Sequence, residues 1–342
     1  MWVIKNIVVR KNLLLLCLLV LSRILCAQDM HFSQVYFSPL SLSPVQTGNF
    51  NGDWRFSNNY RTQWRSVAIP YNTLSAGFEK QFYLHKEHFA GGLYILNDES
   101  GHVFLNVTKI YVSFAYHKAI NYNNFHIGLQ AGYVHKSYDK DKATMPSQFD
   151  MSTGYFNSSL DNGELNLNDK TGYPDVNLAL GWSRRFSIVE PEIALSFFHL
   201  NFPKESFLTE DNRLPVRSVF SGRLLTHISD KWLLTPTIFA MGHRNAADII
   251  AGTRLDYYFK PTPVFFKGVF GGFYYRITPE NVDAMIIQGG LTFKNFEIGL
   301  SYDYNVSALK PATGNRGAFE IGFIFTGPSS MLNKYTIPCE RM

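Results

Sequence analysis

Residues 125–136 read FHIGLQAGYVHK, and this stretch decides the fold. Every second residue from Phe125 to Tyr133 is apolar, whereas the residues between them are His, Gly, Gln and Gly. The stretch FEIGLSYDYN at residues 296–305 alternates in the same way. Because successive side chains of a β-strand point to opposite faces, each stretch predicts a strand with one apolar and one polar face.

The same alternation recurs along most of the chain. It predicts fourteen strands, at 52–65, 71–84, 87–97, 104–119, 123–137, 174–187, 190–200, 215–228, 231–242, 246–259, 263–276, 282–293, 295–306 and 316–326. A soluble antiparallel sandwich also alternates, but its strands are usually about 5 to 6 residues long. Strands of about 10 residues cross a bilayer at a tilt, and polar faces rich in Gly, Ser and Asn suit a water-filled lumen. The predicted fold class is therefore all-β, an antiparallel transmembrane outer-membrane β-barrel of about 14 strands.

The connections between these strands alternate in length. The long ones are 138–173, 201–214 and 307–315, and the joints between them are as short as Lys294 alone, although 243–245 is short where a long one is expected. Bacterial outer-membrane barrels have short periplasmic turns and long outer loops. This pattern predicts an outer-membrane protein with the 138–173 loop outside and both termini in the periplasm. An even number of strands also closes the sheet without a free edge.

The N-terminal segment has the three-part layout of a secretory signal peptide. A basic start precedes the apolar run at 13–21, and Ala27 is a small residue at which a signal peptidase could cut. Residues 1–27 carry four Lys or Arg residues and no acidic residue, so their removal lowers the net charge from +5 to +1. The positive net charge was the main argument for a nucleic-acid partner, and it largely disappears with this segment. Lipidation at Cys26 is the alternative, but the large Leu25 stands where a lipidation site has a small residue.

The chain is therefore expected to have one folded domain. The division is a signal peptide at 1–27, a periplasmic or plug segment without periodicity at 28–51, the transmembrane barrel at 52–326 and a periplasmic tail at 327–342. Cys339 in the tail is the only cysteine left after the signal peptide is removed, so the mature fold cannot contain an internal disulfide.

No catalytic, cofactor-binding or metal site is predicted. His85 and His88 lie at a hairpin turn where side chains diverge, so a solvated turn is favoured over a metal site. The acidic residues of the 138–173 loop lack the fixed spacing of oxygen ligands that a dedicated calcium loop has. A Gly-x-Ser-x-Gly elbow is absent, and no Ser/His/Asp set can be singled out.

The polar faces of the first and last strands carry opposite charges. The predicted lumen charges are Arg55, Arg61 and Arg65 on the first strand and Glu297, Asp303 and Glu320 on the last two. Because the first and last strands of a closed barrel are neighbours, we predict that Arg55 or Arg61 pairs with Glu320 and helps to fix the closing register. Separate, solvated lumen charges are the alternative, since exposed ion pairs contribute only about 0–1 kcal/mol.

Several motifs together resemble the PorP/SprF family. The opening of the predicted mature chain reads QDMHFSQ at 28–34 and continues with Tyr36, SPL at 38–40 and Leu42. Further matching motifs are GDWR at 52–55, NYR at 59–61, QW at 63–64, PY at 70–71, GLQAGY at 128–133, PDVN at 174–177, FHLN at 198–201, SYD at 301–303 and Pro338-Cys339. The resemblance runs over essentially the whole mature chain.

This resemblance implies a function and partners. Members are non-enzymatic, integral outer-membrane components of the type IX secretion machinery of Bacteroidetes, often tied to gliding motility. Their implied partners are periplasmic ring or motor proteins of that machinery, or one large surface adhesin, besides outer-membrane lipid. The segment before the first strand and the tail are the candidates for docking a periplasmic partner or for plugging the barrel, with His31, Phe32, Ser33, Gln34, Tyr36, Pro39 and Cys339 as candidate residues.

Two other functions compete with the secretion component. A barrel of this size also supports a channel for small or hydrophobic molecules. An outer-membrane enzyme acting on lipid requires a nucleophile with a base nearby, which the sequence does not single out. Conductance across a planar bilayer distinguishes the channel, and a hydrolase assay distinguishes the enzyme.

Overall fold

The computed structural model describes most of residues 31–328. The gaps are 66–68, 86, 102–103, 140–145, 158, 161–167, 208–210, 244–245, 262–264, 280 and 308–312. The predicted signal peptide at 1–27, residues 329–342 of the predicted tail and the candidate residue Cys339 lie outside the described residues.

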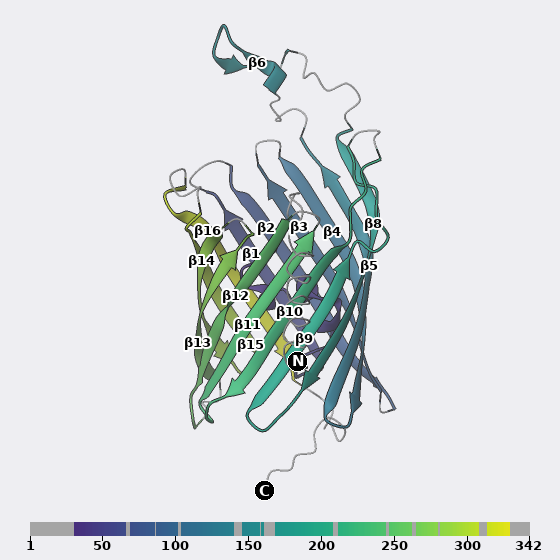
Figure 1. Cartoon of the computed structure of the whole chain (residues 1–342), viewed down its shortest axis with the longest axis vertical. Coiled ribbons are helices and arrows are strands. Elements are labelled where there is room, and N and C mark those ends of the chain that lie inside the picture. The colour runs from purple at the N-terminus through teal and green to yellow at the C-terminus, as the bar shows by residue number, and fades with distance from the viewer. Residues whose placement is uncertain are drawn as a thin grey trace, which may run out of the picture.

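Fourteen long strands form one closed antiparallel barrel, which confirms the predicted fold class and strand number (Figure 1). Their bounds are β1 Trp54–Gln63, β2 Tyr71–Leu84, β3 Glu87–Ser100, β4 Leu105–Ile120, β5 Asn123–Ser137, β8 Lys170–Arg184, β9 Val189–Phe198, β10 Arg217–His227, β11 Trp232–His243, β12 Ala246–Tyr258, β13 Phe266–Ile277, β14 Val282–Phe293, β15 Phe296–Asn305 and β16 Arg316–Gly327. Each strand pairs with its neighbour in sequence, and β1 pairs with β16 to close the sheet.

The strand ends lie within a few residues of those predicted. The first strand stops at Gln63 and not at residue 65, because Trp64 has a φ of +58° and turns the chain out of the extended conformation. The long loop after β5 holds a 3₁₀ turn, η3 Pro146–Gln148, and a short hairpin of β6 Phe149–Asp150 and β7 Tyr155–Phe156. Figure 1 shows this hairpin standing above the barrel, at the end where the long loops lie.

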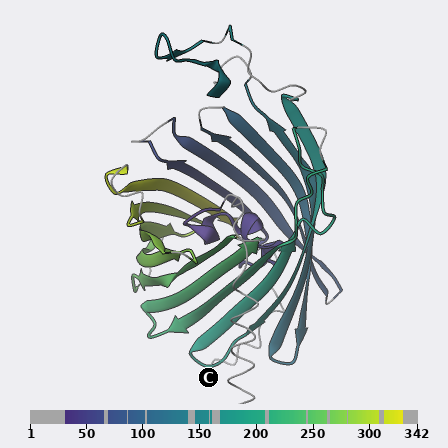
Figure 2. The ribbon, with the colours of Figure 1, turned by 45° about the horizontal axis from the view of Figure 1, so that its top comes forward.

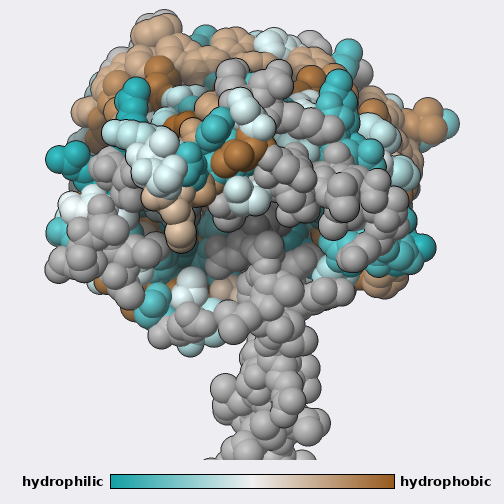
Figure 3. Space-filling model, turned by 90° about the horizontal axis from the view of Figure 1, so that it is seen from above, coloured by the Kyte–Doolittle hydropathy of each residue, from teal (hydrophilic) through white to brown (hydrophobic). Residues whose placement is uncertain are grey.

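The two faces of the sheet differ as the alternation predicts. On β4 the outward Val112 is 64% exposed, whereas its neighbour Ser113, which faces the lumen, is 1% exposed. Leu129 and Gln130 on β5 show the same contrast. Seen from the long-loop end, apolar residues gather along the upper edge of the molecule in Figure 3, and hydrophilic residues lie below them. None of the helices in the described part of the chain is long and apolar enough to cross a membrane.

A charge placed on the outer face tests whether that face meets lipid. Leu129 lies near the middle of β5 and is 48% exposed, so Leu129→Arg is expected to lower the free energy of unfolding by about 2–4 kcal/mol. Ile188→Arg, at an exposed turn between β8 and β9, is the matched control and should cost far less. Urea unfolding in lipid vesicles measures both. Equal stability of the two variants would contradict a lipid-facing β5.

The segment before β1 lies inside the barrel (Figure 2). We call residues 31–50 the lumen segment. It forms three short turns, η1 Val35–Phe37, α2 Pro39–Leu42 and η2 Pro44–Gln46. A proline occupies the first position of α2 and of η2, where its fixed φ suits a helix start, and Ser43 accepts a hydrogen bond from the backbone N–H of Val45.

The lumen segment packs against opposite sides of the barrel. Val35 and Leu42 belong to an apolar cluster with residues of β9 to β14, such as Ile250 and Ile286. Phe32 and Leu40 belong to a second cluster, with Tyr94 and other residues of β3 to β8. Val45 packs on Ala179 and Ala194. The centre of the barrel is thus a core formed by the lumen segment and the surrounding wall.

Candidate functional site

The lumen segment runs along the lumen from the long-loop half to the short-turn half. Its first described residue, His31, places Nε2 2.9 Å from Oδ2 of Asp248, which lies near the long-loop end of β12. Toward the other end, the backbone N–H of Gly48 donates to Oε2 of Glu79 at 3.0 Å, in the half of β2 that leads to a short turn. The contacts of the segment with the wall define the candidate site.

Ser33 is the centre of a buried polar cluster at the closing seam of the barrel. Its backbone N–H donates to Oε1 of Glu320 at 2.7 Å, and its hydroxyl donates to Oδ2 of Asp303 at 2.8 Å. The guanidinium groups of Arg61 and Arg276 both reach the same hydroxyl, at 2.7 and 2.5 Å. We call Ser33, Arg61, Arg276, Asp303 and Glu320 the seam cluster. Four strands thereby converge on one residue of the lumen segment.

The seam cluster is a network of charge-assisted bonds. Arg61 and Glu320 stand directly opposite each other in the pairing of β1 with β16 and form an ion pair. Arg276 lies 2.9 Å from Oδ2 of Asp303, and the backbone N–H of Gln34 donates to Oε2 of Glu320 at 2.8 Å. All four charged residues are at most 5% exposed. Such bonds are stronger in a site shielded from water than at a surface.

The structure separates the other predicted seam charges. Arg55 pairs with Glu79 at 2.8 Å, because Glu79 is its direct partner on β2, whereas its partner on β16 is Thr326. The prediction that Arg65 points into the lumen is wrong, because the strand ends before it and its side chain is exposed.

Glu297 also takes no part in the seam cluster. Its carboxylate pairs with Arg254 of β12 at 2.7 Å, across the lumen side of the intervening strands. Its direct partner on β16 is Ile324, so the strand register does not place Glu297 opposite a basic residue of the closing seam. The predicted seam charges that the structure brings together are thus Arg61, Asp303 and Glu320.

Three charged residues of this network were missed in the sequence. Asp248 links His31 to Arg276 of the seam cluster, and Glu79 pairs with Arg55 and accepts from the N–H of Gly48. All three lie on the lumen-facing positions of their strands. Extending the alternation to every strand would have flagged them as lumen charges, but their partners depend on the register and on the path of the lumen segment.

Glycines in the wall create the space that the lumen segment fills. A Cβ atom at Gly299 would lie 2.5 Å from Cζ of Phe37, and one at Gly322 would lie 2.5 Å from Cγ of the same ring. Gly299 and Gly322 are paired on β15 and β16. At the other side, a Cβ at Gly128 would lie 2.6 Å from the backbone N of Val45. These approaches are possible only where the wall has no side chain.

The end of the lumen segment is held by hydroxyl and imidazole groups. The Thr47 hydroxyl lies 2.6 Å from that of Ser113, and its carbonyl lies 2.8 Å from Nε2 of His117. His117 Nδ1 lies 2.7 Å from Nδ1 of His126, whose Nε2 lies 3.1 Å from the hydroxyl of Ser183. The sequence did not single out this Ser–His contact, because β5 and β8 bring together residues that are 57 positions apart. Ser183 is 6% exposed.

The remaining candidate residues also face the wall. Phe32 and Pro39 are buried, and Tyr36 lies under the guanidinium of Arg223, 4.7 Å from its ring centre. These contacts are those of a plug, and a docking role for the same residues stays a prediction. Among the described residues, no three His, Cys, Asp or Glu side chains are grouped so as to hold a metal ion.

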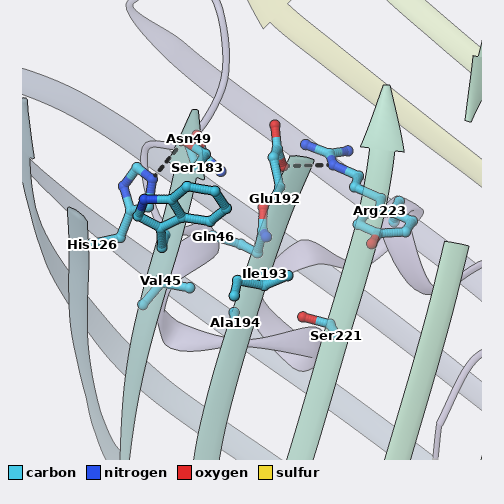
Figure 4. Close-up of a pocket in the computed structure, with 12 residues that line it drawn as sticks. Val45, Gln46, Asn49, His126, Ser183, Glu192, Ile193, Ala194, Ser221 and Arg223 are labelled. Atoms are coloured by element: carbon cyan, nitrogen blue, oxygen red, sulfur yellow. Dashed lines mark hydrogen bonds and ion pairs between the residues drawn. The ribbon is translucent and has the colours of Figure 1, made fainter. Parts of the chain in front are cut away.

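A small pocket separates the lumen segment from β5, β8, β9 and β10 (Figure 4). Gln46 and Asn49 line it from the segment, and His126, Glu192 and Arg223 line it from the wall. Glu192 and Arg223 form an ion pair of 2.6 Å within it. Figure 4 shows their charged groups pointing to the same side as Asn49.

Solved structures share the fold. The toluene transporter TbuX of Ralstonia pickettii is similar with a TM-score of 0.50 and 10% identity, over 84% of this chain and 93% of that chain. A deletion mutant of TodX, described as a monoaromatic hydrocarbon channel, has a TM-score of 0.50 and 11% identity, over 83% and 92% of the two chains. At this identity the likeness concerns the fold alone. No protein with a curated description matches the chain.

A family match covers most of the chain. The family described as "Type IX secretion system membrane protein PorP/SprF" matches residues 25–325, which include the lumen segment and nearly the whole barrel. The chain therefore belongs to the PorP/SprF family of type IX secretion system membrane proteins.

Proposed function

We propose that this protein is a non-enzymatic outer-membrane component of the type IX secretion machinery that anchors or assists the export and display of a surface protein. Family membership carries this proposal. The barrel fold supports an outer-membrane location. The alternation of short turns and long loops supports periplasmic termini, with the 138–173 loop at the cell surface.

The packing of the lumen favours an anchor over an open channel. Phe37, Leu40 and Leu42 of the lumen segment are at most 2% exposed and lie against strands on opposite sides of the barrel. A permeation path would require this segment to leave, which exposes its apolar side chains and breaks the seam cluster. The barrel is thus proposed to act through its ends, by docking periplasmic components of the machinery and one exported protein.

A channel for small or hydrophobic molecules is the second candidate. Two solved barrels of the same fold are named as a toluene transporter and a monoaromatic hydrocarbon channel. Because identity to both is close to 10%, the fold is the only support that they give.

Conductance and cross-linking distinguish the two candidates. In planar bilayers the purified wild-type protein is expected to remain closed, since the lumen segment fills the barrel. Cross-linked membranes are expected to yield other secretion components together with an exported surface protein after purification of this chain. Stable conductance that hydrocarbons block, with only general porins recovered by cross-linking, would contradict the anchor and support the channel.

A further inference from the structure

The hydrogen bonds around His117 form a chain in which each donor is fixed. The Thr47 carbonyl can only accept, so Nε2 of His117 carries a proton, and Nδ1 of neutral His117 is an acceptor. His126 must then donate through Nδ1, and its Nε2 accepts from the hydroxyl of Ser183. With both imidazoles neutral, the bonds thus run from Ser183 through His126 and His117 to Thr47.

We propose that this chain is an acid-sensitive latch that holds the end of the lumen segment against β4 at neutral pH and releases it when both histidines are protonated. One extra proton can be accommodated: doubly protonated His117 donates to Nδ1 of His126, which changes tautomer and donates to Ser183. A second proton places N–H groups face to face across 2.7 Å, and neither has an acceptor. The two nitrogens must then separate.

The surroundings give these charges little compensation. His88 lies beside His117 with a ring-centre distance of 4.6 Å, so a third imidazole adds to the repulsion when it is protonated, and Tyr83 stacks on its other side. On the side of the lumen segment, Glu79 is already bound to Arg55 and to the N–H of Gly48.

The other charged groups around the latch are likewise paired or turned away. Glu192 of β9 lines the same pocket as His126, and its carboxylate is paired with Arg223 of β10 (Figure 4). Glu87 and Lys118, which neighbour the histidines in the chain, point to the outer face and pair with each other. Arg184, next to Ser183, lies over the rings of Tyr122 and Phe186.

The sign of the pH effect follows from linkage. An unperturbed histidine has a pKa of about 6.5, so the unfolded chain or a released segment takes up protons below that pH more readily than the closed latch does. The latch therefore stabilises the seated segment above about pH 6.5 and loses that contribution as the pH falls. Release of Thr47 and Gly48 would widen the pocket at the short-turn end.

Thiol accessibility tests the latch in the full chain. With Cys339 replaced by serine, Val45→Cys places a reporter in the lumen segment, where Val45 is 2% exposed, and Met151→Cys, at a position 91% exposed, is the reference thiol at each pH. Dithiodipyridine serves as the labelling reagent, because it reacts with thiols at acid pH as well as at neutral pH. Relative to the reference, labelling at position 45 is expected to be about tenfold faster at about pH 5 than at about pH 7.5.

Two substitutions give the decisive comparison. His126→Gln leaves a neutral donor to His117 and is expected to reduce the acid response to less than about twofold, whereas His85→Gln, at an exposed turn, should leave it unchanged. His117→Gln, which can still donate to the Thr47 carbonyl, is the substitute if the first variant does not fold. The proposal is overturned if wild-type labelling does not accelerate in acid. It is also overturned if His126→Gln, or its substitute His117→Gln, keeps the wild-type acid response, or if His31→Gln abolishes that response. The test needs no secretion partner, so its outcome is independent of the proposed function.

Discussion

Replacing Glu320 with alanine is expected to lower the free energy of unfolding by about 3–5 kcal/mol. Glu320 is fully buried and accepts bonds from Arg61 and from the backbone N–H groups of Ser33 and Gln34. Its loss leaves the two backbone N–H groups without this acceptor, and Arg61 must then share the carboxylate of Asp303 with Arg276. Urea unfolding in lipid vesicles, followed by the gel mobility of the folded barrel, measures the loss.

A surface carboxylate provides the control for Glu320. Glu87 also forms an ion pair on a strand, with Lys118, but its side chain is 35% exposed. Glu87→Ala should therefore change stability very little, because solvent already screens that pair. If Glu320→Ala does not fold, Glu320→Gln, which keeps the shape and one acceptor, should show a smaller loss. A Glu320 variant as stable as the Glu87 variant would refute the role assigned to the seam cluster.

Filling the wall beneath Phe37 is expected to displace the lumen segment. In Gly299→Val the new side chain takes the space of the Phe37 ring, since even its Cβ would lie 2.5 Å from that ring. We expect a loss of about 1–3 kcal/mol in unfolding free energy, as for other overpacked cores. We also expect conductance in planar bilayers, where the wild-type protein is expected to remain closed.

A control glycine on the outer face and a compensating double variant distinguish this effect from general damage to the sheet. Gly271→Val adds the same side chain on the outer face of β13, where its Cβ would meet nothing nearer than 3.9 Å, and should leave stability and conductance unchanged. Phe37→Ala alone should cost about 3–5 kcal/mol. Combined with Gly299→Val it should cost clearly less than the sum of the two single losses, because the truncated residue makes room for the valine. Strict additivity of the two losses would argue against their contact.

The strands were predictable because their signal is local. The stretch at 125–136 carries its apolar and polar faces in neighbouring residues, and the structure has β5 at Asn123–Ser137. A bilayer also forces every backbone N–H and C=O of a spanning strand to pair within a closed sheet, so an even set of such strands has few arrangements. Where the prediction went too far, at Arg65, a single residue with positive φ ended the strand.

The site was predictable only in part. The opposition of Arg61 and Glu320 followed from the closure of the barrel, because β1 and β16 must meet and both side chains lie on the polar faces. The partner of Arg55 could not be predicted in the same way. The sequence alone did not show whether Arg55 would pair with Glu79 on β2 or with an acidic residue of the last strands. The choice rests on the register, and one residue of slip changes every facing pair.

The sequence by itself determined a fourteen-stranded outer-membrane barrel with one polar and one apolar face. It could do so because apolar and polar residues alternate within each strand, and neighbouring residues are enough to show this pattern. Only the tertiary structure decided what fills the barrel. The lumen segment has no periodicity, and its partners lie far away in the chain: Ser33 meets Asp303 across 270 positions and Glu320 across 287. Which distant groups meet depends on the curvature and register of the whole closed sheet, which no local stretch of residues contains.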